Sequence, residues 1–273
     1  MGSNNNQNKD LQDKQADLLD QTYTLGWMDG YAEGYDDAIE DTQNALNKLE
    51  NENELLTEVV ESKDNVIKEY LKNVYFITGT PCGGKTTVSR ALAEKYGFEL
   101  FDVDERFDEH KKMSNPLFQP AMNTYFNSAD EFFGRTVEEY KNWLLNNTRE
   151  QLEFVLLDLI RLSENKKVLC DCHLTVAQAL AFSEPARVVF LIKDPSNLVD
   201  EYGNRPDHQG FFQYLNSATD IEKAKQTVNI TLYELNVNRI EEIKSSSFFW
   251  IERTVDSTVE STLTCVEKHL GLI

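Results

Sequence analysis

The residues best suited to chemistry lie in one short run, Gly79-Thr80-Pro81-Cys82-Gly83-Gly84-Lys85-Thr86. This run fits the phosphate-loop pattern of a Gly, four residues and then Gly-Lys-Ser/Thr. Glycines let backbone N–H groups turn inward around a phosphate, at the positive end of a following helix. Lys85 can reach the β- and γ-phosphates of a nucleoside triphosphate, and the Thr86 hydroxyl can bind Mg²⁺. The run, together with Thr87 directly after it, predicts a site for ATP and Mg²⁺.

The sequence on either side supports this interpretation. Residues 74–78 are typical of a buried strand, and residues 87–96 mix apolar and polar side chains as an amphipathic helix does. The alternative is a Gly-rich turn that matches the pattern by chance. A strand and a helix in register with the loop disfavour that alternative.

Three carboxylates stand at the ends of predicted strands, where open α/β sheets bind their ligands. Asp102 and Asp104 follow a strand over residues 98–102, and Asp171 ends a strand over residues 167–171. We expect Asp102 and Asp171 to lie near Mg²⁺, and Asp104 to accept the proton of a substrate hydroxyl. The alternatives are a solvated turn in which Asp104 caps a helix, and a strand-end turn for Asp171.

Four arginines and one histidine are further candidates. Arg205 lies in an irregular polar stretch, residues 202–216, which has the composition of a lid. There it would place positive charge on a transferring phosphoryl group, although an exposed loop arginine is the alternative. The candidates for contact with substrate are Arg106, Arg135 and His173. Arg253 is a candidate for contact with the nucleotide base. A histidine near a loop is also often only hydrogen-bonded to its neighbours.

The amino-acid composition limits the classes of partner that the chain is expected to bind. The net charge is −20, and the first 70 residues hold 17 of the 47 acidic residues but only 5 of the 27 basic ones. Neither part offers the basic surface of a nucleic-acid binder, so we expect no nucleic-acid partner. No apolar run approaches about 18 residues and no leader-like N-terminus is visible, so we expect no membrane span. Four cysteines without metal-ligand spacing favour a reducing cytoplasm.

An unbroken heptad pattern precedes the phosphate loop. It predicts a parallel dimeric coiled coil, because a buried Asn at an a position, here Asn53, selects two strands. A single long helix folded back on the C-terminal domain and a mostly disordered segment are the alternatives. The seam consists of Leu25, Met28, Ala32, Tyr35, Ile39, Thr42, Leu46, Leu49, Asn53, Leu56, Val60, Lys63, Ile67 and Tyr70.

From residue 74 onward, strands alternate with helices, which predicts a parallel α/β sheet. Further strands are expected at residues 187–193 and 248–252. Helices are expected over most of residues 104–150, at residues 151–162 as a separate buried helix, and at residues 255–270.

The order of these motifs over residues 74–270 resembles the small-molecule P-loop kinases, and most closely the shikimate-kinase-like branch. Besides the phosphate loop, the similar segments are Phe101-Asp102-Val103-Asp104, Glu131-Phe132-Phe133-Gly134-Arg135, Asn204-Arg205-Pro206 and Leu232-Tyr233-Glu234. The resemblance implies a three-layer α/β fold with a five-stranded parallel sheet, ATP and Mg²⁺ as cofactors, and an alcohol group as phosphate acceptor.

Two departures from that family bear on the acceptor. Shikimate kinases follow the third strand with a glycine run, where this chain has Asp171-Cys172-His173, and they carry a substrate arginine at about the position of Asn229. A carboxylate-bearing substrate would miss both contacts. The acceptor is therefore left open as a small hydroxyl-bearing molecule.

The expected organisation is a disordered polar tail over residues 1–20, a helical coiled coil over residues 21–72 and a P-loop kinase domain over residues 73–273. The leading hypothesis is an ATP-dependent kinase of a small hydroxyl compound that forms a homodimer through its N-terminal helix. The alternative is an NTP-binding regulatory or ATPase module that signals through its coiled coil.

Overall fold

The computed structural model describes residue 14 and residues 16–17, 32–197 and 209–273. The chain divides into two compact units, Met1–Asp64 and Asn65–Ile273. In the first unit the main described element is helix α2 (Ala32–Tyr70), whose last residues belong to the second unit. The first two residues of the predicted seam, Leu25 and Met28, and most of the predicted polar tail lie outside the described residues. None of the helices in the described ranges has the length and apolar character of a membrane span.

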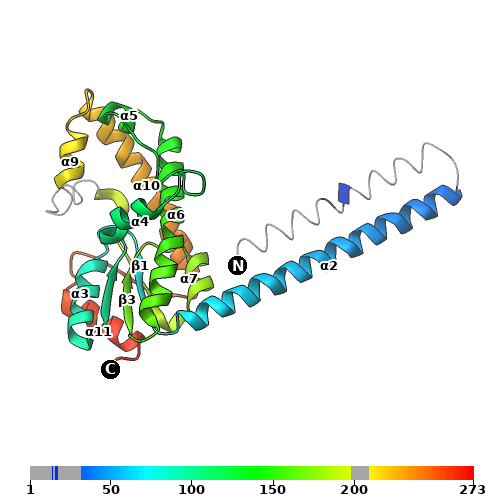
Figure 1. The fold of residues 1–273 in the computed structure, drawn as a ribbon, viewed down its shortest axis with the longest axis horizontal. Coiled ribbons are helices and arrows are strands. Elements are labelled where there is room, and N and C mark those ends of the chain that lie inside the picture. The colour runs from blue at the N-terminus through cyan, green and yellow to red at the C-terminus, as the bar shows by residue number, and fades with distance from the viewer. Residues whose placement is uncertain (1–13, 15, 18–31, 198–208) are drawn as a thin grey trace. The chain divides into compact units, whose positions relative to one another are not determined.

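The second unit is a three-layer α/β fold around a five-stranded sheet, as the sequence predicts (Figure 1). Its strands are β1 (Val74–Gly79), β2 (Glu99–Asp102), β3 (Val168–Asp171), β4 (Val188–Ile192) and β5 (Phe249–Glu252). They lie in the order β2-β3-β1-β4-β5, and every neighbouring pair is parallel. In a parallel sheet all carboxyl ends share one edge, so the residues after β1, β2 and β3 are brought together.

Helices cover both faces of the sheet (Figure 1). On one face α3 (Lys85–Tyr96) and α11 (Val259–His269) enclose a core that includes Ile77, Leu169 and Leu191. On the other face Phe76 and Phe190 share a core with residues of three further helices. These helices are α6 (Val137–Ser163), α7 (Val176–Phe182) and α10 (Ile221–Ser245). Burial on both faces explains why β4 is a continuous apolar run rather than an alternating one.

The long helices α6 and α10 continue beyond the sheet into a second, smaller core. There Phe133, Tyr140, Leu215 and Val228 pack together. Figure 1 shows α5 (Ala129–Phe133) and α9 (Gln209–Leu215) grouped with one end of α10 away from the sheet. The remaining short helices are η1 (Asp104–Arg106), α4 (Phe107–Met113), η2 (Pro185–Arg187) and η3 (Pro195–Asn197).

Three predicted elements differ from the structure. Residues 151–162 are not a separate helix but the second half of α6, which starts at a capping box of Thr136 with Glu139 and then meets no helix breaker. The closing helix begins at Val259 rather than at residue 255, because Thr258 caps it. Of the predicted lid, residues 202–208 lie outside the described ranges, whereas residues 209–215 form α9 instead of an irregular loop.

Gly79, at the end of β1, has a backbone that only glycine adopts without strain. Its φ is +128°, and a Cβ built there would lie 2.0 Å from the Leu191 carbonyl oxygen of β4. Because that oxygen is backbone in the centre of the sheet, it cannot move aside cheaply. The close approach of β1 to β4 therefore depends on this glycine.

We expect Gly79→Ala to lower the free energy of unfolding by at least about 3 kcal/mol, since it adds both strain and a backbone clash. Urea unfolding followed by circular dichroism measures this loss. Gly210→Ala is the matched control, because its Cβ would meet nothing within 4 Å. This helical position should gain up to about 1 kcal/mol. Equal unfolding midpoints for the Gly79 variant and the wild type would contradict this description.

Candidate active site

The phosphate loop, residues 79–86, joins β1 to α3 and lies against the end of β4. The Thr80 N–H donates to the Leu191 carbonyl at 3.0 Å, and the Thr80 hydroxyl accepts from the Lys193 N–H at 2.8 Å. A Cβ on Gly83 would lie 2.4 Å from the same Leu191 oxygen. The strand–loop–helix arrangement predicted from the sequence is present, and β4 fixes the path of the loop.

The start of α3 has the form of an anion site. Gly84, at the N-cap, has a φ of +92° and no side chain that could cap the first N–H groups of the helix. Uncapped N–H groups at a helix N-terminus carry partial positive charge and bind phosphate. Cys82 also adopts a left-handed conformation, with a φ of 58°. Its carbonyl accepts a 2.9 Å hydrogen bond from Arg253 Nη1, which anchors the loop to the segment after β5.

Lys85 folds over this loop. Its side chain is 8% exposed, and its Nζ donates to the Thr80 carbonyl oxygen at 3.1 Å. Burial lowers the pKa of Lys85, and the negative charge of Asp171 opposes this shift. The cation is thus hydrogen-bonded to a neutral group at the place where a phosphate would lie.

Asp102 and Asp171 are register partners at the ends of β2 and β3. Burial raises the pKa of Asp171 to about 6, while Lys85 and a hydrogen bond from the Thr86 side chain act in the opposite direction. Its Oδ2 is buried and has no hydrogen-bond partner among the described residues. A buried carboxylate oxygen beside Thr86 has the chemistry of a Mg²⁺ ligand.

Asp104 completes the acidic edge. It opens η1, is exposed, and its N–H donates to Asp102 Oδ1 at 3.0 Å. Its charge acts on both Lys85 and Asp171, so the three groups are neighbours. Within the described ranges no three His, Cys, Asp or Glu side chains could hold a metal by themselves. The site fits Mg²⁺ held partly by nucleotide phosphates, as in P-loop proteins.

Arg135 lies inside a box of aromatic rings. Its guanidinium carbon is 4.4–4.8 Å from the ring centres of Phe126, Phe132, Tyr140 and Trp143. Its Nε donates to the Phe132 carbonyl at 2.8 Å, and burial lowers the pKa of Arg135. These cation–π contacts explain how the charge is held within the smaller core. Its predicted substrate contact stays a prediction.

Two of the other three predicted arginines, Arg106 and Arg205, have no tested role in the structure. Arg106 is paired with Glu109 one turn along, at 2.9 Å, and lies 5.7 Å from the centre of the Phe101 ring. Arg205 lies outside the described residues. A substrate role for Arg106 and a charge-stabilising role for Arg205 therefore stay predictions.

His173 lies beside the phosphate loop, two residues beyond Asp171. The nearby charge of Lys85 and burial hold the pKa of His173 well below its ordinary value, so the ring is neutral at physiological pH. A hydrogen bond with the Gly79 backbone also involves this ring. His173 is thus within the candidate site, as a neutral group.

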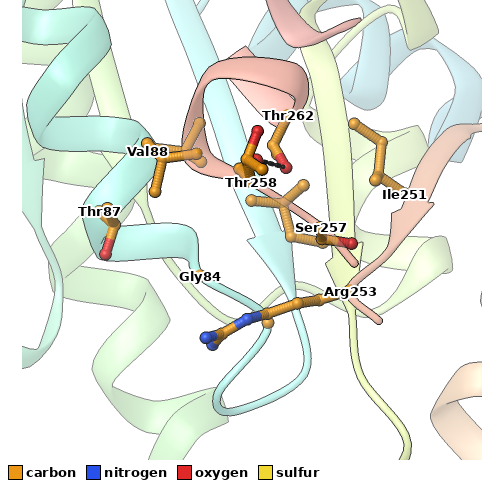
Figure 2. A pocket seen from close by; sticks show the side chains of 11 residues that line it. Gly84, Thr87, Val88, Ile251, Arg253, Ser257, Thr258 and Thr262 are labelled. Carbon is orange, nitrogen blue, oxygen red and sulfur yellow. Dashed lines mark hydrogen bonds between the residues drawn. The ribbon is translucent and has the colours of Figure 1, made fainter. Parts of the chain in front are cut away.

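Arg253 lines a cavity of about 100 Å³ beside the phosphate loop (Figure 2). The cavity lies between the start of α3, with Gly84 and Val88, and the segment around Ser257 and Thr258. Figure 2 shows the Arg253 side chain extending toward the phosphate loop near Gly84. The predicted contact of Arg253 with a nucleotide base stays a prediction.

Sequence reasoning missed two polar residues near the site. Arg239 of α10 donates to the Leu174 carbonyl at 2.6 Å, and its charge contributes to lowering the pKa of both Lys85 and His173. Gln151 of α6 donates to the Val103 carbonyl at 2.8 Å. For Arg239, helical spacing could have indicated a buried position, because Arg239 lies three residues after Asn236 and four before Ile243, both of which are buried on α10.

Comparison with known proteins gives structural likeness only. No family model and no curated protein matches this sequence. A shikimate kinase from Bacteroides thetaiotaomicron is similar with 16% identity and a TM-score of 0.41, over 72% of this chain and 98% of that one. A "putative kinase" from Chloroflexus aurantiacus is similar with 15% identity and a TM-score of 0.40, over 72% and 97%. Sequence identities and TM-scores this low give no basis for assigning the function of those proteins to this chain.

Asp171 should give the protein a measurable pH dependence of stability. Its pKa rises from an ordinary value of 3.8 to about 6 on folding. Between these values the folded chain holds a proton that the unfolded chain has released. The favourable contribution of Asp171 to the free energy of unfolding is therefore fully present below the lower pKa and is lost as the pH rises through the upper pKa. The total loss is about 3 kcal/mol.

Urea unfolding of the wild type and of Asp171→Asn between about pH 4 and pH 7 tests this linkage. The difference in unfolding free energy between the two proteins should shift in favour of the variant as pH rises. A difference independent of pH would mean that Asp171 titrates normally in the folded chain.

Proposed function

We propose that this chain is an ATP-dependent phosphotransferase that acts on the hydroxyl of a small molecule. The observation that carries the proposal is the meeting of Lys85, an uncapped α3 and the buried Asp171 at one edge of the sheet. Binding of a nucleoside triphosphate would supply charged hydrogen-bond partners for Lys85, whose present partner is the neutral Thr80 carbonyl. We propose a cytoplasmic location, since four cysteines without metal-ligand spacing favour a reducing compartment.

In this mechanism the loop backbone and Lys85 bind the phosphates. Lys85 would exchange its bond to the Thr80 carbonyl for the β- and γ-phosphate oxygens and so stabilise charge that develops on transfer. Thr86, Asp171 and Asp102 would hold Mg²⁺, which would supply positive charge beside the phosphates. Arg253 would lie by the base.

The acceptor would approach from the side of Asp104. This carboxylate is exposed and can take the proton of an alcohol as the alcohol oxygen attacks the γ-phosphorus. The bond from the γ-phosphorus to the bridging oxygen would break, and ADP would leave with that oxygen. Asp171 is less suited to that role, because it is buried against Thr86 and faces the metal position. From the sequence, Arg106, Arg135 and His173 are the proposed contacts with the acceptor, and Arg205 is proposed to stabilise charge on the transferring phosphoryl group.

We further propose that α2 forms a homodimeric coiled coil. Its central seam residues Leu49, Leu56 and Val60 are exposed on this 39-residue helix. A parallel partner helix would bury them and would pair Asn53 with its counterpart. The partner that fits this surface is a second copy of the chain.

One observation favours the second candidate, a regulatory ATPase module. Only residues 71–73 separate α2 from β1, and Leu71 is fully buried in the core with Ile67 packed beside it. The end of α2 is therefore fixed to the strand that leads into the phosphate loop. Such a connection could transmit nucleotide state to the helix.

ADP formation over a panel of sugars, polyols, nucleosides and aminoglycosides distinguishes the two candidates. A kinase should form ADP rapidly only with one class of acceptor. Turnover that is fast and equal without any acceptor would contradict the kinase proposal and favour the ATPase.

Two substitutions should separate effects on ATP binding from effects on phosphoryl transfer. Lys85→Met should slow transfer by at least about 10³-fold, since it removes the charge at the phosphates. Asp104→Asn should slow it by about 10²–10⁴-fold and leave ATP affinity nearly unchanged. Asp108→Asn, which removes an exposed charge from the neighbouring helix α4, is the control and should keep wild-type rates. Full activity in the Asp104 variant would remove it from the mechanism.

The coiled-coil proposal predicts the molecular mass of the full-length protein in solution, as a dimer. Sedimentation equilibrium should give a dimer for the wild type and a monomer for Leu56→Asp, because a buried charge at the seam repels its counterpart. Asn51→Asp adds the same charge two residues after Leu49, on the outward side of the heptad, and should stay dimeric. A monomeric wild-type chain would rule out the dimer.

A further inference from the structure

His110 takes no part in the mechanism above, yet its contacts lead to the carboxylates of the site. The side chain is 0% exposed, and its ring stacks on Phe154 of α6, with 5.7 Å between ring centres and 17° between planes. Its Nε2 lies 3.3 Å from Asp158 Oδ2, and its Nδ1 lies 3.4 Å from the amide nitrogen of Gln151. Both ring nitrogens are therefore engaged by residues of α6.

These contacts fix the tautomer of the ring. The amide nitrogen of Gln151 can only donate, so Nδ1 accepts and the proton resides on Nε2, where it is donated to the Asp158 carboxylate. The amide nitrogen also donates to the Val103 carbonyl at 2.8 Å. A flipped amide would set Oε1 against that carbonyl oxygen, with two acceptors in contact. Asp158 thus orients His110, and His110 orients Gln151.

The chain of hydrogen bonds ends on Val103, the residue between Asp102 and Asp104. The Val103 N–H donates to the Asp171 carbonyl at 3.1 Å, and its own carbonyl accepts from Gln151. Both backbone groups of Val103 are held, one by the edge of the sheet and one by α6. The place of the Asp104 carboxylate relative to Asp171 therefore depends on Gln151.

We propose that Gln151, oriented by His110 and Asp158, is a positioning residue that sets where the Asp104 carboxylate meets the acceptor. This inference rests on the proposed function of Asp104. Gln151 acts through the Val103 backbone and not through contact with substrate. Without the amide, the Val103 carbonyl would keep only the Arg106 N–H of its own turn, at 3.2 Å, and would lose its bond to α6, so the turn would no longer be held against that helix.

The chain offers a matched control on the same helix. Asn147 lies one turn before Gln151, is 9% exposed against 7%, and donates its amide to the Ala121 carbonyl at 3.3 Å. That carbonyl belongs to a loop without the carboxylates of the site. Asn147→Leu and Gln151→Leu each remove a buried amide bond to a carbonyl that keeps a second donor, Trp143 Nε1 for Ala121 and the Arg106 N–H for Val103. Gln151→Leu also removes the contact with His110 Nδ1.

The first readout is amide hydrogen exchange of the full-length protein, measured by NMR without any ligand. Exchange of the Asp104 N–H, bonded to Asp102 Oδ1 at 3.0 Å, should be faster in Gln151→Leu by about tenfold or more. Asn147→Leu should leave it at the wild-type rate. Equal exchange in the two variants would overturn the inference.

The second readout is turnover with an acceptor from the panel. Gln151→Leu should lower kcat by about 10–100-fold with the KM for ATP unchanged, because a displaced base slows chemistry and not nucleotide binding. Asn147→Leu should keep the wild-type kcat, and a shared loss would again overturn the inference. Gln151→Glu, which keeps the shape and loses the donor, replaces Gln151→Leu if that variant does not fold. Absence of turnover in the wild type would refute the proposed function, while the exchange experiment would still decide the role of Gln151.

Discussion

Lys85 at the start of α3 and Asp171 at the end of β3 place opposite charges inside the protein, and neither charge is fully compensated there. Lys85 is bonded to the neutral Thr80 carbonyl, and Asp171 keeps a buried oxygen without a partner among the described residues. Burial accordingly lowers the pKa of the lysine and raises that of the aspartate. An isolated buried charge is costly, so this edge of the sheet is suited to a ligand that brings both negative phosphates and a cation.

The rest of the fold serves to keep this edge in place. Gly79 and Gly83 let the loop approach Leu191 of β4, and Arg253 holds the loop from the carboxyl end of β5, at the same edge of the sheet. The long helices α6 and α10 reach the same edge through Gln151 and Arg239, each of which binds a carbonyl next to a site residue. A rigid, two-sided core thus carries polar groups whose positions depend on few hydrogen bonds.

The phosphate loop and the strands could be predicted because their signals are local. Residues 74–86 carry a buried strand and a glycine pattern in one continuous segment, and β4 is an apolar run with no interruption. The aromatic box around Arg135 could not be predicted, because its four rings come from the loop before α5, from α5 and from α6, which meet only in the fold. The contact of Gln151 with Val103 joins residues 48 positions apart, which no periodicity reveals. The length of α6 was missed although Thr136 and Glu139 mark its start.

The central claim is that this edge binds ATP together with Mg²⁺, and calorimetric titration of ATP into the full chain tests it most directly. Titrations run with Mg²⁺ and with a chelator in its place should differ. We predict one ATP per chain in the presence of Mg²⁺ and an affinity at least about tenfold weaker without it, since Thr86 and Asp171 would then lose their shared ligand. No binding in either condition, or equal affinity in both, would contradict the account.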